Sequence, residues 1–127
     1  MILLDTDVMV DILRGYEPAR QWLESATSQE IGVPGLVAME LLQGCQNGRE
    51  QKRLEKALSA YLLYWAEPQD CARALKNFAA YRLSHQLGLL DALIAETAVG
   101  FDAELATFNT KHYKILKDLR TIQPYAR

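Results

Sequence analysis

The chain has 127 residues, half of them apolar, which suffices to bury one continuous hydrophobic core, so we expect a single domain over residues 1–127. Its formal net charge of −2 argues against a broadly basic surface that holds nucleic acid by neutralising phosphates. The same net charge is compatible with a local basic rim. No apolar run approaches the roughly 20 residues of a membrane-spanning helix, and Asp5, Asp7 and Asp11 interrupt the N-terminus where a signal peptide would be basic and then apolar, so we expect a cytoplasmic protein.

Short apolar runs alternate with stretches of helical periodicity along the chain. Gly15 closes the first helical stretch, and Pro18 and Pro34 suit the first turn of a helix, where a missing N–H costs nothing. In chain order we predict a strand at 2–4, helices at 8–13 and 18–24, a strand at 31–33, helices at 36–45 and 49–64, a brief strand at 65–68, helices at 71–87 and 91–99, and strands at 105–107 and 119–122.

This alternation predicts the fold class. Short, wholly apolar strands between helices are typical of an α/β/α sandwich with a central, mostly parallel sheet of about four or five strands. Ligands of such sheets usually bind beyond the carboxyl ends of the strands. Asp5 directly follows the first predicted strand, so we expect it at that edge of the sheet.

Carboxylates interrupt apolar segments at Asp5, Glu40 and Asp91. Asp5 has two open interpretations, a cap for the next helix or a metal ligand, and Asp91 taken alone suits a helix N-cap. Glu40 lies on the apolar stripe of a predicted helix, where an unpaired buried carboxylate would cost several kcal/mol, so a cation, a basic partner or exposure at a groove must compensate it.

If these carboxylates converge at one end of the sheet, they suit Mg²⁺ or Mn²⁺, which prefer carboxylate and water oxygens. Neither histidines nor the two cysteines form a cluster, which argues against zinc. The chemistry that such a site implies is metal-assisted hydrolysis of a phosphodiester, in which the ion activates a water and offsets charge on the phosphate, and a second ion can stabilise the leaving oxygen.

Other polar residues near these acids have simpler interpretations. Asp7 and Thr6 suit helix capping, although the Thr6 hydroxyl could also hold a metal-bound water. Glu96 and Asp102 suit solvent exposure, with Glu96 the better spare ligand, and Thr107 suits a strand.

The basic residues also have two interpretations. His85 and His112 accompany no Ser or Cys nucleophile motif, so a surface or core role is favoured over acid–base catalysis. Most Lys and Arg residues at helical spacing keep a face soluble, but two groups could form a basic rim for RNA: Lys111, Lys114, Lys117 and Arg120, and Arg49, Lys52, Arg53 and Lys56.

Four segments, at residues 3–8, 39–41, 90–95 and 106–109, resemble in order the acidic motifs of PIN domains of the VapC type. The resemblance implies an Mg²⁺-dependent endoribonuclease, the toxin of a VapBC-type toxin–antitoxin pair. It further implies that Asp5, Glu40 and Asp91 are the catalytic and metal-binding acids. Asn109 stands where many relatives have a fourth acid.

An amide at Asn109 offers a carbonyl oxygen to a metal or its water but brings no negative charge, which weakens a second-metal site. The resemblance also implies an RNA substrate, a homodimer, and a cognate VapB-type antitoxin that inserts a peptide, often with an arginine, against the acidic pocket. No membrane partner is expected.

Two other classes of function compete with the nuclease. The first is a catalytically weak PIN-fold module that binds protein or RNA, which Asn109 would favour. The second is a phospho-receiver domain, which also places acids at strand ends. That class requires a Lys before a late Pro and an acceptor Asp after a middle strand, and Leu119 to Pro124 contains no such Lys, so we rank it last.

Overall fold

The computed structural model describes all residues 1–127. It contains a five-stranded sheet in the order β3-β2-β1-β4-β5, and all neighbouring strands are parallel. The strands are β1 (Ile2–Leu4), β2 (Ile31–Pro34), β3 (Leu62–Tyr64), β4 (Glu104–Ala106) and β5 (Arg120–Ile122). The helices are α1 (Thr6–Leu13), α2 (Glu17–Ser25), α3 (Gly35–Gln43), α4 (Gly48–Leu58), α5 (Pro68–His85), α6 (Leu89–Gly100) and α7 (Thr110–Tyr113).

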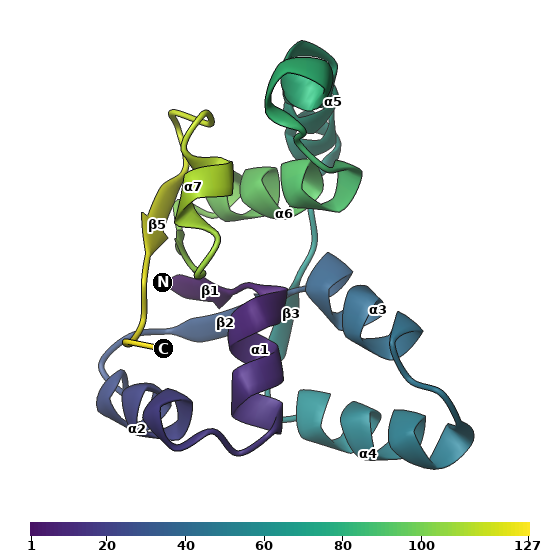
Figure 1. Cartoon of the computed structure of the whole chain (residues 1–127), viewed down its shortest axis with the longest axis vertical. Coiled ribbons are helices and arrows are strands. Elements are labelled where there is room, and N and C mark those ends of the chain that lie inside the picture. The colour runs from purple at the N-terminus through teal and green to yellow at the C-terminus, as the bar shows by residue number, and fades with distance from the viewer.

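Helices cover both faces of the sheet, with α1 and α2 on one side and α5 and α6 on the other (Figure 1). This arrangement confirms the predicted α/β class with a parallel central sheet. None of the helices combines the length and the apolar character that crossing a bilayer requires.

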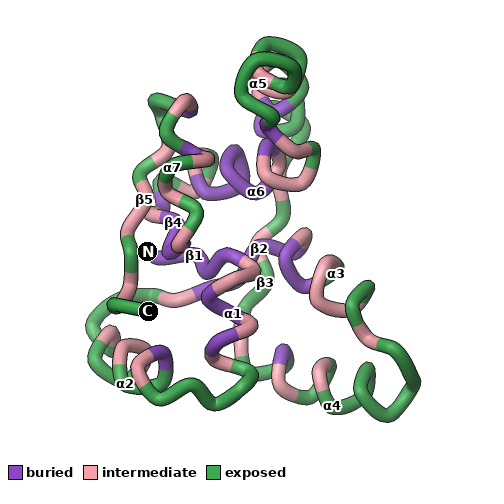
Figure 2. The backbone as a smooth tube through the Cα atoms, viewed as in Figure 1, coloured by how far each residue is buried: buried purple, intermediate pink, exposed green.

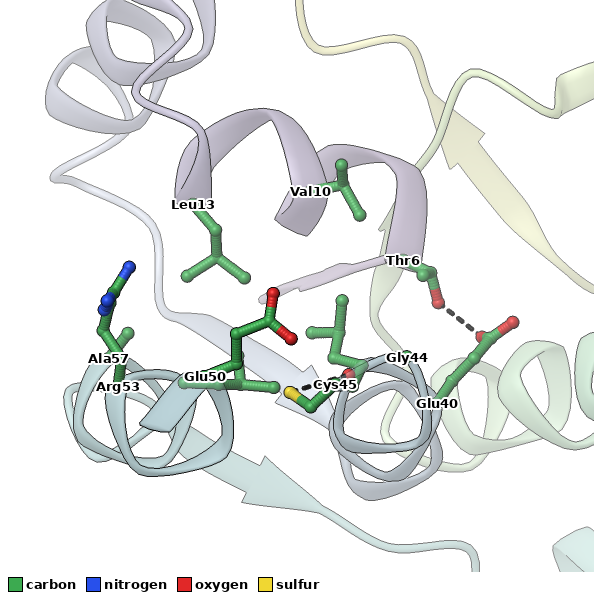
Figure 3. Close-up of a pocket in the computed structure, with 11 residues that line it drawn as sticks. Thr6, Val10, Leu13, Glu40, Gly44, Cys45, Glu50, Arg53 and Ala57 are labelled. Carbon is green, nitrogen blue, oxygen red and sulfur yellow. Dashed lines mark hydrogen bonds between the residues drawn. The ribbon is translucent and has the colours of Figure 1, made fainter. Parts of the chain in front are cut away.

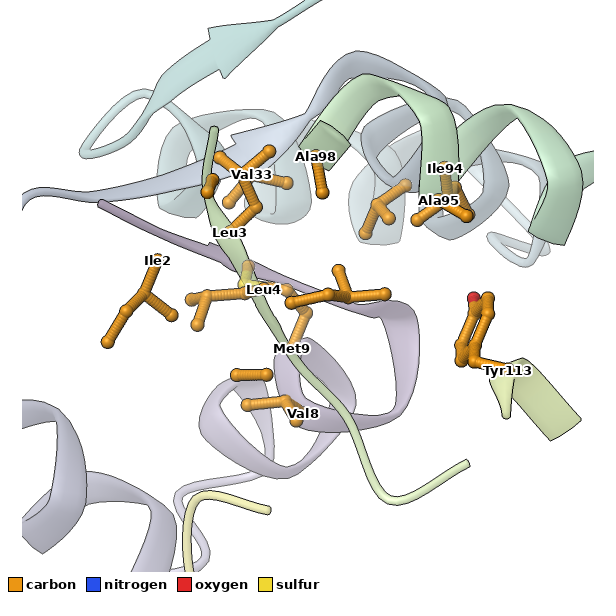
Figure 4. Packing of buried hydrophobic residues seen from close by; sticks show 14 of the residues in the cluster. Ile2, Leu3, Leu4, Val8, Met9, Val33, Ile94, Ala95, Ala98 and Tyr113 are labelled. Carbon is orange, nitrogen blue, oxygen red and sulfur yellow. The ribbon is translucent and has the colours of Figure 1, made fainter. Parts of the chain in front are cut away.

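The core lies on both sides of β1, the central strand. Leu3 and Leu4 are fully buried, and Val33 and Leu105 are buried in the strands on either side (Figures 2 and 4). Because both faces of β1 are covered, its sequence is a continuous apolar run rather than an alternating one. The strand therefore ends abruptly at the first polar residue, Asp5.

Two of the predicted elements are wrong. The amphipathic helix predicted over 49–64 ends at Leu58, and Leu62–Tyr64 forms the edge strand β3, whereas 65–68 is not a strand. The pairing partner explains the difference: Gly32 in β2 lies opposite Leu62 and has no side chain, and a Cβ there would overlap the ring of Tyr64. The short helix α7 was not predicted at all.

Candidate active site

Asp5 lies at the carboxyl end of β1 and is the N-cap of α1. One carboxylate oxygen, Oδ1, accepts the backbone N–H of Thr6 at 2.8 Å. The other, Oδ2, accepts the hydroxyl of Thr107 at 2.8 Å and the hydroxyl of Tyr113 at 3.1 Å. The capping interpretation of Asp5 is therefore confirmed, and it leaves the carboxylate facing residues from the end of β4 and from α7.

Asp91 reaches the same place from the other face of the sheet. It lies in the first turn of α6, whose N-cap is Gly88, so the N-cap interpretation of Asp91 is wrong. Its Oδ1 accepts the hydroxyl of Tyr113 at 3.3 Å, and its Oδ2 lies 3.3 Å from Nε2 of His112. Tyr113 thus joins Asp91 to Asp5 through a single hydroxyl.

Glu40, on α3, closes a third side of this cluster. Its Oε1 accepts the hydroxyl of Thr6 at 2.6 Å, and the carboxylate is only partly buried. Exposure at a groove and a hydroxyl donor are therefore what compensate its position on an apolar stripe. Thr6 follows the Asp5 cap directly, so its two polar groups connect Asp5 with Glu40.

Asp7 belongs to the same network, although the sequence indicated only a cap. Its carboxylate accepts the backbone N–H groups of Val8 at 2.8 Å and Phe108 at 2.9 Å, and the hydroxyl of Thr107 lies 3.5 Å away. Thr107 is fully buried and donates mainly to Asp5. Asp7 and Thr107 therefore tie the start of α1 to the end of β4, which holds the Asp5 carboxylate in place.

The cluster is electrostatically strained. Burial raises the pKa of Asp5 to about 6, against the hydrogen bonds from Thr6, Thr107 and Tyr113, and the charge of Asp7 adds to the rise. Burial, and then the neighbouring carboxylates, raise the pKa of Tyr113 well beyond its ordinary range, so this hydroxyl stays a neutral donor.

Asp91 shows the same balance. Burial raises its pKa, the charge of His112 and the hydrogen bond from Tyr113 oppose the rise, and the charges of Glu40 and Asp7 add to it. The basic side chain that pairs with this cluster is His112, and no Lys or Arg forms an ion pair with these acids. An excess of negative charge in a partly dry site is what a divalent cation would offset.

The donor set suits a hard cation such as Mg²⁺, since Asp5 after β1, Glu40 of α3 and Asp91 of α6 carry carboxylates within one hydrogen-bond network that pairs with no Lys or Arg. The side chains do not yet enclose an ion, because no three acidic, imidazole or thiol groups surround one point. The Tyr113 hydroxyl stands between Asp5 and Asp91 instead. A cation bound by both carboxylates would compete with this hydroxyl for their oxygens.

Asn109, the expected fourth ligand, lies apart from the acids. Its backbone N–H donates to the Thr107 hydroxyl at 3.0 Å, while its side chain makes no hydrogen bond to Asp5 or Asp91. The side chain instead lines a surface hollow together with His85 and His112. The structure thus connects Asp5 with Asp91 through the Tyr113 hydroxyl and Asp5 with Glu40 through the N–H and hydroxyl of Thr6, and it leaves Asn109 at the rim.

The two spare acids have separate positions. Glu96 is buried rather than exposed, and its carboxylate pairs with Nε of Arg73 at 2.8 Å, while Arg73 also pairs with Asp70 at 2.6 Å. That pairing connects α5 with α6 and occupies Glu96, which is therefore not a free ligand. Asp102 is exposed as expected and pairs with Arg120.

A groove of about 450 Å³ opens beside Glu40, between α1, α3 and α4 (Figure 3). Thr6 and Glu40 form its acidic end, next to the cluster. Much of the remaining wall is apolar. Glu50 of α4 points into the groove, and Arg53 lies at the end opposite Thr6 and Glu40. The lining residues are Thr6, Val10, Leu13, Glu40, Leu41, Gly44, Cys45, Glu50, Arg53, Leu54 and Ala57.

Comparison with known proteins places this chain in one family. The family model of the PIN domain matches residues 2–117. Ribonuclease VapC10 of Mycobacterium tuberculosis is 35% identical over 121 residues, which cover 94% of this chain and 91% of that protein. Ribonuclease VapC19 of the same organism is 38% identical over 125 residues, covering 94% and 98%. The chain belongs to the PIN-domain family.

Solved structures agree with this assignment. The chain of a toxin–antitoxin complex from Klebsiella pneumoniae superposes with a TM-score of 0.77 at 26% identity, and the match covers 100% of both chains. A chain of VapBC2 from Rickettsia felis, bound to a promoter DNA fragment, has the same fold with a TM-score of 0.80 at 23% identity, covering 96% and 98%. Within the PIN-domain family, this chain is similar to VapC-type proteins, which confirms the resemblance to that family.

Proposed function

We propose that this protein is an Mg²⁺-dependent endoribonuclease and the toxin of a VapBC-type toxin–antitoxin pair, acting on RNA in the cytoplasm. The observation that carries the proposal is the hydrogen-bonded cluster of Asp5, Glu40 and Asp91 at the carboxyl edge of the sheet. Two relatives that are 35% and 38% identical over the aligned residues are named ribonucleases, which supports the same activity here.

In this proposal Asp5 and Asp91 hold the ion and Glu40 acts beside it. A bound Mg²⁺ or Mn²⁺ would lower the pKa of an attacking water and offset charge that develops on the phosphate. Thr107 and the Thr6 N–H orient the Asp5 carboxylate, and Thr6 orients Glu40. Asn109 adds no charge, so we propose that one ion suffices, with Asn109 contacting the substrate or its water.

The groove beside Glu40 suggests how an antitoxin would inhibit. We propose that a VapB-type segment lays apolar side chains along Val10, Leu13 and Leu54 and places a basic side chain at Glu40, since the groove combines an apolar wall with one acidic end. The chain solved in the Klebsiella pneumoniae toxin–antitoxin complex shares this fold over its full length, which supports a partner of that kind.

A homodimer is also part of the proposal. Large apolar side chains stand exposed on β3 and the neighbouring helices, at Met39, Leu62, Trp65, Leu75 and Leu89. Exposed apolar groups of this number on a small chain favour burial in an interface. Light scattering of the purified protein would test this, because a monomer at micromolar concentration would contradict it.

The competing candidate is a PIN-fold binding module without cleavage. It is favoured by the Tyr113 hydroxyl, which occupies the place between the two principal acids, and by the absence of a closed cation cage. Incubating total cellular RNA with antitoxin-free protein in Mg²⁺ or in EDTA separates the candidates. Discrete cuts that require Mg²⁺ support the nuclease and reveal its target, whereas intact RNA in both lanes from a folded protein supports the binding module.

A further inference from the structure

A second polar hollow, of about 570 Å³, lies on the outer side of α7, next to the acid cluster. Its lining residues are His85, Asn109, Lys111, His112, Lys114 and Ile115. None of them is acidic, and all but Ile115 carry polar or basic side chains. We refer to this feature as the α7 hollow.

The charges of the α7 hollow are free to meet a ligand. Most of the ion pairs of the protein engage arginines with nearby carboxylates, for example Arg73 with Glu96 and Arg127 with Asp11. Lys111 and Lys114 are exposed and take part in none of these pairs. In a chain of formal net charge −2, two unpaired lysines around one hollow make a local positive site.

The α7 hollow touches the acid cluster through one side chain. His112 lines the hollow and also lies 3.3 Å from Asp91, so the two sites share a wall. Tyr113, the next residue, points the opposite way and donates to Asp5 and Asp91. The four-residue helix α7 therefore presents the Tyr113 donor to the acids on its inner side, and Lys111 and the C-cap residue Lys114 lie on its outer side.

We propose that the α7 hollow binds a backbone phosphate of a single-stranded RNA, next to the phosphate that is cut. Lys111 and Lys114 would neutralise this phosphate, and Asn109 would donate a hydrogen bond from its amide. Such contacts fix the register of the strand without reading its bases. This inference rests on the ribonuclease function proposed above, and it gives Asn109 a role in substrate contact in place of metal binding.

The test measures how RNA binding by the Asp91→Asn protein depends on salt. Binding is measured by the fluorescence anisotropy of a labelled single-stranded RNA in Mg²⁺. Each phosphate contact on a single strand contributes a slope of about −0.7 to log K against log salt. Replacing both lysines, K111Q/K114Q, is expected to reduce the magnitude of that slope by about 0.7 to 1.4, depending on whether the lysines share a phosphate.

The control replaces two exposed basic residues that lie outside both predicted basic groups and form no ion pair, R14Q/K76Q, and is expected to leave the slope unchanged. An unchanged slope in K111Q/K114Q, or an equal reduction in the control, would overturn the inference. Cleavage of total RNA by the unsubstituted protein is measured in parallel. If the unsubstituted protein cleaves RNA while K111Q/K114Q keeps its slope, only the inference about the α7 hollow is wrong. If the unsubstituted protein neither cleaves nor binds RNA, the proposed function is wrong as well.

Discussion

The Tyr113 hydroxyl offers a sharp test of how the acid cluster is held. Tyr113→Phe removes one oxygen and leaves the ring, which is almost fully buried near Ile94 and Ala95 (Figure 4). Asp5 would keep two donors, the Thr6 N–H and the Thr107 hydroxyl, and Asp91 would keep His112. Hydrogen bonds to charged groups contribute about 1.5–3 kcal/mol, so the metal-free variant should lose about that much unfolding free energy.

The same substitution should strengthen metal binding, because the hydroxyl and a cation compete for the space between Asp5 and Asp91. A difference of 1.4 kcal/mol is about tenfold in affinity, so we expect Tyr113→Phe to bind Mn²⁺ roughly tenfold to a hundredfold more tightly. Urea unfolding in EDTA and in saturating Mn²⁺, together with calorimetric titration, measures both effects. A stability deficit of equal size with and without Mn²⁺ would refute the competition.

Three further changes follow from the structure. Because burial raises the pKa of Asp5 to about 6, the metal-free protein should lose up to about 3 kcal/mol of unfolding free energy as pH rises from about 4 to above 6. Urea titrations in EDTA should show that Asp5→Asn abolishes this loss, and an unaltered pH profile in the variant would contradict the prediction. Burial acts to raise the pKa of Asp11, but hydrogen bonds from Arg127 and Tyr125 and the charge of Arg127 outweigh burial and lower the pKa. The ionised Asp11 therefore stabilises the fold above the pKa that it has in the unfolded chain, and this stabilisation is lost as pH falls below about 4. Arg127→Ala should therefore cost about 1–2 kcal/mol at pH 7 and less near pH 3, and an equal cost at both pH values would argue against the pair. Gly32→Ala should cost about 1–3 kcal/mol in thermal unfolding, since the added methyl overlaps the ring of Tyr64, and an unchanged melting temperature would show that β3 is free to shift.

The principal acids could be identified from the sequence because each interrupts an apolar segment, and a carboxylate in such a position demands a reason. Their convergence could be expected from the parallel sheet, whose strand ends meet at one edge. The edge strand β3 could not be predicted, since Leu54, Leu58, Tyr61 and Leu62 continue a helical spacing past the true helix end. Only its pairing with Gly32, far away in sequence, decides the conformation.

Tyr113 and the partners of Glu96 were missed for a related reason. The helix α7 has four residues, too few for a periodic signal, so nothing in the sequence indicates that Tyr113 faces inward. Glu96 meets Arg73 across 23 positions of sequence, and the pairing depends on how α5 packs against α6. Contacts of this kind arise from the packing of elements rather than from the pattern within one element.

In the proposed nuclease, Asp91 belongs to a metal-dependent site that cleaves RNA. The most direct test of this role is the cleavage rate of the identified RNA in Mg²⁺ for the unsubstituted protein, Asp91→Asn and Asp102→Asn, the last being a matched exposed control that shares the amide chemistry. We predict that Asp91→Asn lowers the rate at least about a hundredfold, as expected for loss of a charged group that acts in the transition state, while Asp102→Asn cleaves normally. Equal rates for all three proteins would show that Asp91 has no part in cleavage.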